Sequence, residues 1–324
     1  MTKLRPLALL CCVSVSLACA DDALGGDELA AETGGESDTD SSSSDSDDST
    51  SSDSDDSTTS DTEGETDTAG ESETDTDTGP DEDDCPIEQF PTYAADPANG
   101  AYPDPFTHVY CEGDEVVVEA NGIPNYEFVQ ITPNPLAAQG HEFRFPRHPE
   151  VAAQPTEIPF LGTTGVAVNG IPLYGPNEGP FPDPFGDPVY NGIVDFCEGH
   201  TAMVGDYHYH AILVECLRAA DVPGQPSPIV AYALDGFPIY GPQGCMDAAC
   251  EDVVEYESGW VQTGDPTTEA WDNYAYQGEN GPTTLDQCNG HVGPKGDYHY
   301  HATSGFPYLL GCYAGTAPHA MQGP

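Results

Sequence analysis

The most regular alternation of side-chain types in the chain is Tyr-His-Tyr-His, which occurs twice, at residues 207–210 and 298–301. In a β-strand, alternate side chains share a face, so the two histidines point to one side and the two tyrosines to the other. Tyrosine favours strands and packs well on a half-buried sheet face. We therefore expect a strand at each copy, with its histidines grouped on one face.

Elsewhere the pattern predicts further short strands and few helices. Strands are expected at residues 115–119, 127–132 and 141–148, which carry β-branched or alternating side chains. His141 and His148, within the last of these, are interpreted as surface or packing residues. Glycine (35) and proline (31) interrupt helices throughout, so short helices are expected only at 213–220 and 247–256. The predicted fold is mainly β, a loop-rich β-sheet domain.

The chain carries an internal duplication. The pattern C-x-G-H-x4-G-D-Y-H-Y-H-A occupies residues 197–211 and 288–302. Before each copy stands a second shared pattern, [ND]-G-[IF]-P-[LI]-Y-G-P, whose Asn-Gly or Asp-Gly step favours a turn. The second copy of the upstream pattern starts 66 residues after the first copy, and the second copy of the histidine pattern starts 91 residues after its first copy. The second repeat therefore holds an insertion of about 25 residues (91 − 66), placed within 245–275. The repeat units span about 165–216 and 230–312.

Composition separates the N-terminal quarter from the rest. Of the 57 acidic residues, 26 fall in 21–84, a stretch with no Lys or Arg and almost nothing apolar. Such a segment cannot form a core and extends by self-repulsion, so we expect a disordered acidic tether over 19–84. Weak calcium binding by its aspartates is the alternative to a solvated spacer. The other 31 acidic residues (57 − 26) accompany only 4 basic ones, which argues against nucleic acid and anionic lipid as partners.

The first residues are typical of an export signal. Lys3 and Arg5 precede an apolar run too short to span a bilayer. Val-Ser-Leu-Ala-Cys at 15–19 resembles a bacterial lipobox. We expect a signal peptide over 1–18, cleavage before Cys19 and lipidation of Cys19. This predicts a cell-envelope lipoprotein on the outer membrane or surface that meets the membrane only through its lipid, or a secreted protein if the lipobox fails.

Eight cysteines follow Cys19, and an even number favours disulfides in an oxidising compartment. The repeat suggests one disulfide bracketing each histidine cluster, with exchange between the two copies as the alternative. Thiolate ligation of a metal is the rival interpretation, although exported thiols oxidise. The suggested pairs are Cys197–Cys216, Cys288–Cys312, Cys245–Cys250 and Cys85–Cys111.

Each copy offers three histidines as metal ligands. Two share a strand face, and the third lies eight residues before the first of them, across a Gly-Asp turn that a hairpin could close. Three imidazoles suit zinc or copper, with tyrosine or water completing the shell. Asp206 and Asp297 could accept the other ring N–H of a ligand. Two separate sites and one shared site are both open. The candidate ligands are His200, His208, His210, His291, His299 and His301.

The doubled Tyr-His-Tyr-His and the pattern before it resemble the YHYH domain family, over roughly residues 110–315. We expect a YHYH-like, disulfide-stapled domain over 85–324. The resemblance implies an exported or surface bacterial protein rather than a particular reaction. It also implies Asn-Gly-Ile-Pro followed by Asp-His near the domain start. Here Asn125 and Tyr126 follow Asn-Gly-Ile-Pro, so this position has no histidine to supply as a ligand.

Two other functions compete with metal binding alone. A three-histidine ion with an open position could activate water, which would make the protein a metal-dependent hydrolase with Glu198, Asp206 or Asp297 as base. Whether the protein is an enzyme is left open. The third hypothesis is a surface module without metal, whose aromatic side chains stack on a glycan or another cell-envelope polymer. Its candidate residues are Tyr174, Tyr240, Trp260 and Trp271.

Overall fold

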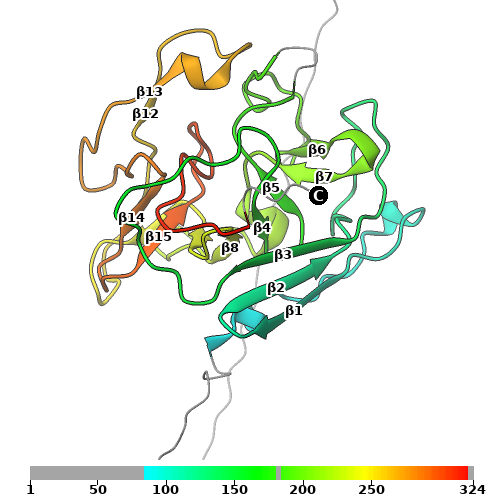
Figure 1. Cartoon of the computed structure of the whole chain (residues 1–324), viewed down its shortest axis with the longest axis horizontal. Coiled ribbons are helices and arrows are strands. Elements are labelled where there is room, and N and C mark those ends of the chain that lie inside the picture. Colours follow the sequence, from blue (N-terminus) through cyan, green and yellow to red (C-terminus); the bar gives the residue numbers. More distant parts are fainter. Residues whose placement is uncertain (1–83, 180–183, 320–324) are drawn as a thin grey trace, which may run out of the picture. The chain divides into compact units, whose positions relative to one another are not determined.

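A computed structural model describes residues 84–179 and 184–319 (Figure 1). Residues 1–83 lie outside the described residues. They include the expected signal peptide, Cys19 and the acidic tether up to residue 83, for which calcium binding was the alternative to a solvated spacer. Within the described ranges, no helix is both long and apolar enough to cross a membrane. Strands outnumber helices among the described elements, and loops connect them, as the sequence predicts.

An antiparallel sheet of three strands opens the folded region. It contains β1 (Thr107–Glu112), β2 (Glu115–Ala120) and β3 (His141–Pro146) in that order. Val116 and Val118 of β2 and Phe145 of β3 enter one buried cluster. Tyr232 of the larger sheet stacks on Phe145, with ring centroids 5.4 Å apart, and so joins the two sheets. The strands predicted over 115–119 and 141–148 are confirmed.

The strand predicted over 127–132 is wrong. The main-chain N–H of Phe128 donates to the side chain of Asn99, at 2.9 Å. The hydroxyl of Thr132 donates to the carbonyl of Thr201, at 2.7 Å. The polar groups of this segment therefore bond to a side chain and a loop instead of a neighbouring strand, and the segment stays irregular.

The duplicated region forms one sheet of eight strands, in the order β14-β15-β9-β8-β4-β5-β7-β6. Each repeat supplies four adjacent strands, and the order of one half mirrors the other. The halves meet at the antiparallel pair β4–β8, where Val166 faces Tyr232. The first repeat forms β4 (Thr163–Ala167), β5 (Pro172–Tyr174), β6 (Gly199–Thr201) and β7 (Tyr207–Tyr209); the second forms β8 (Ile229–Ala233), β9 (Pro238–Tyr240), β14 (Gly290–Val292) and β15 (Tyr298–His301).

Each Tyr-His-Tyr-His copy lies in the second strand of a short hairpin, as predicted. In β6–β7, His200 pairs with His208. In β14–β15, His291 pairs with His299. The first hairpin is at one edge of the sheet and the second at the other edge (Figure 1). The duplication therefore creates two separate histidine groups.

The tyrosines of the same strands fill the core beneath the hairpins. Tyr207, Tyr209 and Tyr300 are at most 1% exposed. They share a buried cluster with Leu173 and Ile239 from the preceding strands. The strand alternation thus places the tyrosines, which are the larger apolar side chains, in the core. It leaves the histidines grouped on the opposite face.

All four suggested disulfides are present, which confirms the pairing within each copy. The bond from Cys197 to Cys216 brackets the first hairpin, and α1 (Val214–Leu217) contains its second cysteine. This short helix lies within the one predicted over 213–220. The other three pairs are Cys85–Cys111, Cys245–Cys250 and Cys288–Cys312.

The predicted helix over 247–256 is wrong. The carboxylate of Asp247 accepts the main-chain N–H groups of Ala249 and Asp252, at 2.8 and 2.9 Å, which favours a turn over a helix. The following residues form β11 (Val253–Glu255), paired with β10 (Gln243–Cys245). The remaining short elements are β12 (Trp260–Gln262), β13 (Tyr274–Tyr276) and the 3₁₀ turns η2 (Pro86–Gln89), η3 (Pro97–Asn99), η4 (Met203–Gly205) and η5 (Ala270–Asn273).

Candidate metal centres

The first histidine group brings four potential ligand atoms together. The Nε2 atom of His210 lies 3.0 Å from that of His208 and 3.2 Å from that of His200. Glu178 adds a carboxylate oxygen 2.6 Å from His200 Nε2. A tetrahedral zinc ion with bonds of about 2.0–2.1 Å separates its ligand atoms by about 3.3 Å. The four residues therefore fit around one ion and could hold it.

The opposite ring nitrogens of these histidines face main-chain carbonyls. Nδ1 of His210 donates to Gly175 O at 2.7 Å, and Nδ1 of His200 donates to Ile193 O at 2.5 Å. A neutral imidazole has one N–H, so each Nε2 then carries a bare lone pair. Lone pairs that converge at 3.0–3.2 Å repel one another unless a proton or a metal cation lies between them. The arrangement orients the rings as protein carbonyls orient metal-bound histidines.

The sequence did not single out Glu178. It lies three residues after Gly175, in the loop that follows β5. Its Oε1 atom accepts the N–H of Gly179 at 2.5 Å, which leaves Oε2 facing His200. Burial opposes ionisation of Glu178, but the adjacent His200 and His210 hold the pKa of this carboxyl well below its usual value. The cluster therefore contains a carboxylate that is charged at neutral pH.

The second group repeats the first with one ligand fewer. The Nε2 atom of His291 lies 3.1 Å from that of His299 and 3.2 Å from that of His301. Nδ1 of His301 donates to Gly241 O at 2.6 Å, which matches the bond from His210 to Gly175. Among the described residues, this cluster comprises the three histidines and no carboxylate.

Burial favours the neutral form of five of the clustered imidazoles. Desolvation lowers the pKa of His301 to about 3 and, with the neighbouring His299, that of His291 to about 4. Desolvation also lowers the pKa of His208, His210 and His299. The neutral form of imidazole is the one that binds a metal, so these side chains need not lose a proton at pH 7.

Two aspartates that the sequence analysis missed hold the hairpins. Asp195 accepts the hydroxyl of Tyr207 at 2.7 Å and the main-chain N–H groups of Cys197 and Gly199 at 2.9 and 3.2 Å. Asp286 makes the same three contacts in the second copy, with Tyr298, Cys288 and Gly290. The signal was visible, because an aspartate stands two residues before the cysteine in both copies.

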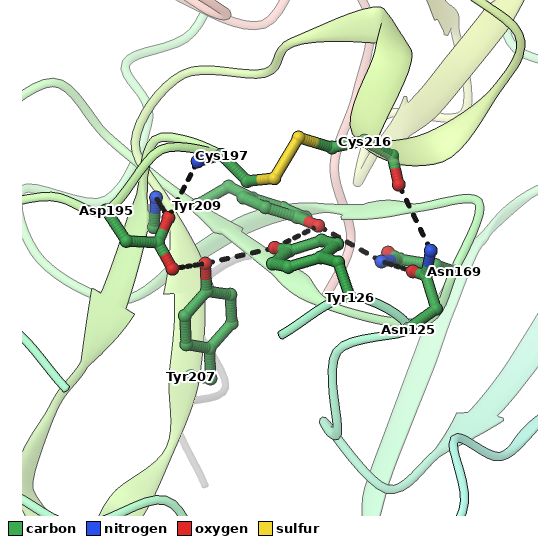
Figure 2. The surroundings of a disulfide bond; sticks show 9 residues. Asn125, Tyr126, Asn169, Asp195, Cys197, Tyr207, Tyr209 and Cys216 are labelled. Carbon is green, nitrogen blue, oxygen red and sulfur yellow. Dashed lines mark hydrogen bonds between the residues drawn. A yellow bond between two sulfur atoms is a disulfide. The ribbon is translucent and has the colours of Figure 1, made fainter. Parts of the chain in front are cut away.

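Figure 2 shows the polar layer under the first hairpin. The hydroxyl of Tyr126 lies 3.0 Å from that of Tyr207 and 2.7 Å from that of Tyr209. Asn125 accepts a hydrogen bond from Asn169, at 2.8 Å. The pair that replaces Asp-His of the family pattern thus belongs to the tyrosine side of the sheet, and it supports the hairpin without joining the histidine cluster.

The ring N–H groups of the two paired strand histidines face the main chain of the aspartates that precede them. His208 Nδ1 lies 3.2 Å from Asp206 O, and His299 Nδ1 lies 3.3 Å from Asp297 O. The carboxylate of Asp297 is 3.6 Å from His299 Nδ1. From the sequence, the carboxylates of Asp206 and Asp297 were expected to accept the ring N–H of a ligand histidine. The main-chain carbonyl oxygens of these aspartates are the atoms that lie closer to Nδ1.

The carboxylate of Asp206 has other partners. It lies 3.0 Å from Nε2 of His141 on β3 and accepts the hydroxyl of Tyr174 at 3.4 Å. The ring of Tyr174 stacks on His208, with centroids 3.9 Å apart. His141 therefore packs in a layer behind the first cluster, in keeping with its interpretation as a packing residue. Glu198, the third base considered, lines a cavity and belongs to neither cluster.

The aromatic residues considered for glycan stacking have partners inside the protein. Tyr174 and Tyr240 lie against the histidines His208 and His299, with ring centroids 3.9 and 5.0 Å apart. Trp260 and Trp271 of the insertion pack around Phe306, at 5.7 and 4.9 Å. The two tryptophans of the insertion thus pack against the core.

The fold and the two clusters define a class: disulfide-bonded β-proteins with buried groups that could hold metal ions. A family model described as "YHYH protein" matches residues 142–315, which is more than half of the chain. The chain belongs to this YHYH family. The matched range begins at residue 142, whereas the sequence resemblance was expected to begin near residue 110. Comparison with curated proteins and with solved structures gave no match.

Proposed function

We propose that this protein binds two transition-metal ions, one in each histidine cluster. The observation that carries the proposal is the convergence of three imidazole Nε2 atoms at both edges of the sheet, where one atom lies 3.0–3.2 Å from each of the other two. Side chains packed for apolar contact alone would have no reason to bring three ring nitrogens, which repel where their lone pairs meet, together in both copies. A shared cation removes that repulsion and accounts for the repeated geometry.

The ligand types favour zinc or copper(II). Imidazole nitrogen suits both ions, and the carboxylate of Glu178 is a ligand that zinc accepts at about 2.0–2.2 Å. Calcium prefers shells made of oxygen atoms, which neither cluster offers among the described residues. We propose zinc or copper as the resident ion of both clusters.

We also propose that the protein works outside the cytoplasm, attached through lipidated Cys19 or secreted. The N-terminal residues resemble an export signal, and the four disulfides favour an oxidising compartment. The acidic segment over 19–84 would then separate the metal-binding domain from the membrane.

Elemental analysis by mass spectrometry tests the proposal. The full chain would be exported to a bacterial periplasm and purified oxidised, without an affinity tag made of histidines. We expect about two ions of zinc or copper per chain, one for each cluster. The His208→Ala/His299→Ala variant is expected to lose most of this metal, because one ligand is removed from each cluster.

The His108→Ala/His148→Ala variant is the matched control, since it also removes two histidines but both are exposed. It is expected to keep the metal content of the native protein. A native protein that holds no ion after exposure to zinc and copper, or a His208→Ala/His299→Ala variant that holds as much as the control, would refute the proposal.

A further inference from the structure

The two clusters differ at one position that the duplication makes equivalent. Gly175 and Gly241 accept the Nδ1 proton of the last histidine in their own copies. Three residues after Gly175 stands Glu178, and three residues after Gly241 stands Gly244. The residue that supplies the fourth ligand atom in the first cluster is therefore a glycine in the second.

An aromatic ring fills the space beside Gly244. A β-carbon placed on Gly244 would lie 2.7 Å from Cε2 of Tyr256 and 2.9 Å from Cε1 of His301. The ring of Tyr256 also lies against His291 and His301, with centroids 4.2 and 4.6 Å apart. Gly244 has no side chain, and carbon atoms of Tyr256 and His301 occupy the space in which one would begin, so position 244 contributes no ligand atom.

The two clusters also differ in how far their histidine side chains are exposed to solvent. In the first, all three histidines are buried, with the side chains of His200 and His210 2% and 1% exposed, and the side chain of Glu178 is 24% exposed. In the second, His291 is only partly buried and the side chain of His299 is 11% exposed. Water therefore reaches the second cluster more readily than the first.

The two clusters also differ in the negative charge that they offer to a metal ion. The carboxylate of Glu178 offsets one of the two positive charges of a divalent ion in the first cluster. Three neutral imidazoles offset none of that charge in the second. Protein sites with four ligands are generally closed, whereas sites with three protein ligands keep a position for water or substrate.

We propose that the second cluster, His291, His299 and His301, is the exchangeable metal site of this protein, and that its ion binds water or a small anion as the fourth ligand. The first cluster, with Glu178, is a closed site that holds its ion without exchanging ligands. This inference rests on the proposed metal binding, and it assigns any ligand exchange or chemistry to the second repeat.

Cobalt(II) and azide test the inference, because the visible spectrum of bound cobalt reports its coordination. The full-length His208→Ala variant, made together with Glu178→Ala so that the first cluster keeps only two ligands, leaves only the second cluster complete, and the His299→Ala variant leaves only the first. Each would be loaded with cobalt and titrated with azide. We expect a saturable spectral change in His208→Ala/Glu178→Ala and binding that is weaker by roughly tenfold or more in His299→Ala.

Adding Glu178→Ala to His299→Ala removes the carboxylate from the first cluster and is expected to create an azide response there. The conservative substitution His208→Gln, made in place of His208→Ala, would repeat the first measurement with a smaller change to the fold. Cobalt bound by the second cluster without an azide response, or an equal response of both clusters, would overturn the inference alone. Cobalt bound by neither cluster would overturn the proposed function as well.

Discussion

The Asp195→Ala variant is expected to lower the free energy of unfolding by about 3–5 kcal/mol. Asp195 is buried, and its carboxylate accepts one hydroxyl and two main-chain N–H groups of the first hairpin. Removing it leaves three buried donors without this acceptor, and each unsatisfied buried group costs about 1–3 kcal/mol. Urea unfolding followed by tryptophan fluorescence and circular dichroism would measure the loss.

The duplication supplies a second test of the same structural role. Asp286→Ala removes the equivalent three contacts in the second copy and is expected to cause a loss of similar size. Asp104→Ala, at an exposed position, is the control and is expected to change stability by less than about 0.5 kcal/mol. Unfolding curves of Asp195→Ala and Asp104→Ala that coincide would show that the aspartate layer does not support the hairpin.

The second large effect is expected from metal itself. An ion that binds only the folded chain stabilises it by about 4 kcal/mol when its free concentration is about 1,000 times the dissociation constant. Zinc added to the metal-free protein is therefore expected to raise the free energy of unfolding by about this amount for each occupied cluster. The measurement is urea unfolding of the same preparation with zinc and with a chelator.

The variants used for metal analysis separate specific from general effects. In His208→Ala/His299→Ala, zinc is expected to add less than about 1.5 kcal/mol for each cluster, because each has lost one ligand and its affinity is at least about 100-fold lower. In His108→Ala/His148→Ala, the full stabilisation is expected. An equal effect of zinc on both variants would indicate binding elsewhere in this acidic chain.

Local patterns were sufficient to predict the histidine groups. The alternation in residues 207–210 and 298–301 defines which side chains share a face, and the eight-residue spacing to His200 and His291 fits a hairpin. The disulfide pairing within each copy followed from the same repeat. These features depend on residues close in sequence, where strand and turn geometry leave few alternatives.

Glu178 could not be predicted in the same way. It precedes His200 by 22 residues (200 − 178), and only the parallel pairing of β5 with β7 brings its loop to the hairpin. The order of the eight strands is also a long-range property, because strands of the two repeats pair at the centre of the sheet, where Val166 faces Tyr232. Neither contact leaves a periodic trace in the sequence.

The wrong predictions have a common physical origin. Residues 127–132 carry strand-forming side chains, but Asn99 and Thr201 take their polar groups. Residues 247–256 contain side chains compatible with a helix, but the carboxylate of Asp247 accepts main-chain N–H groups of this segment and holds it in a turn. In both cases, side-chain hydrogen bonds outweighed the intrinsic backbone preference.

Anomalous diffraction from crystals of the zinc-loaded, full-length protein tests the central claim most directly. Data collected on both sides of the zinc absorption edge would locate the ions without reference to the ligands. We predict one peak among the Nε2 atoms of His200, His208 and His210 and one among those of His291, His299 and His301, about 2.0–2.1 Å from each. Zinc bound only to surface carboxylates, with no peak at either histidine cluster, would contradict the account.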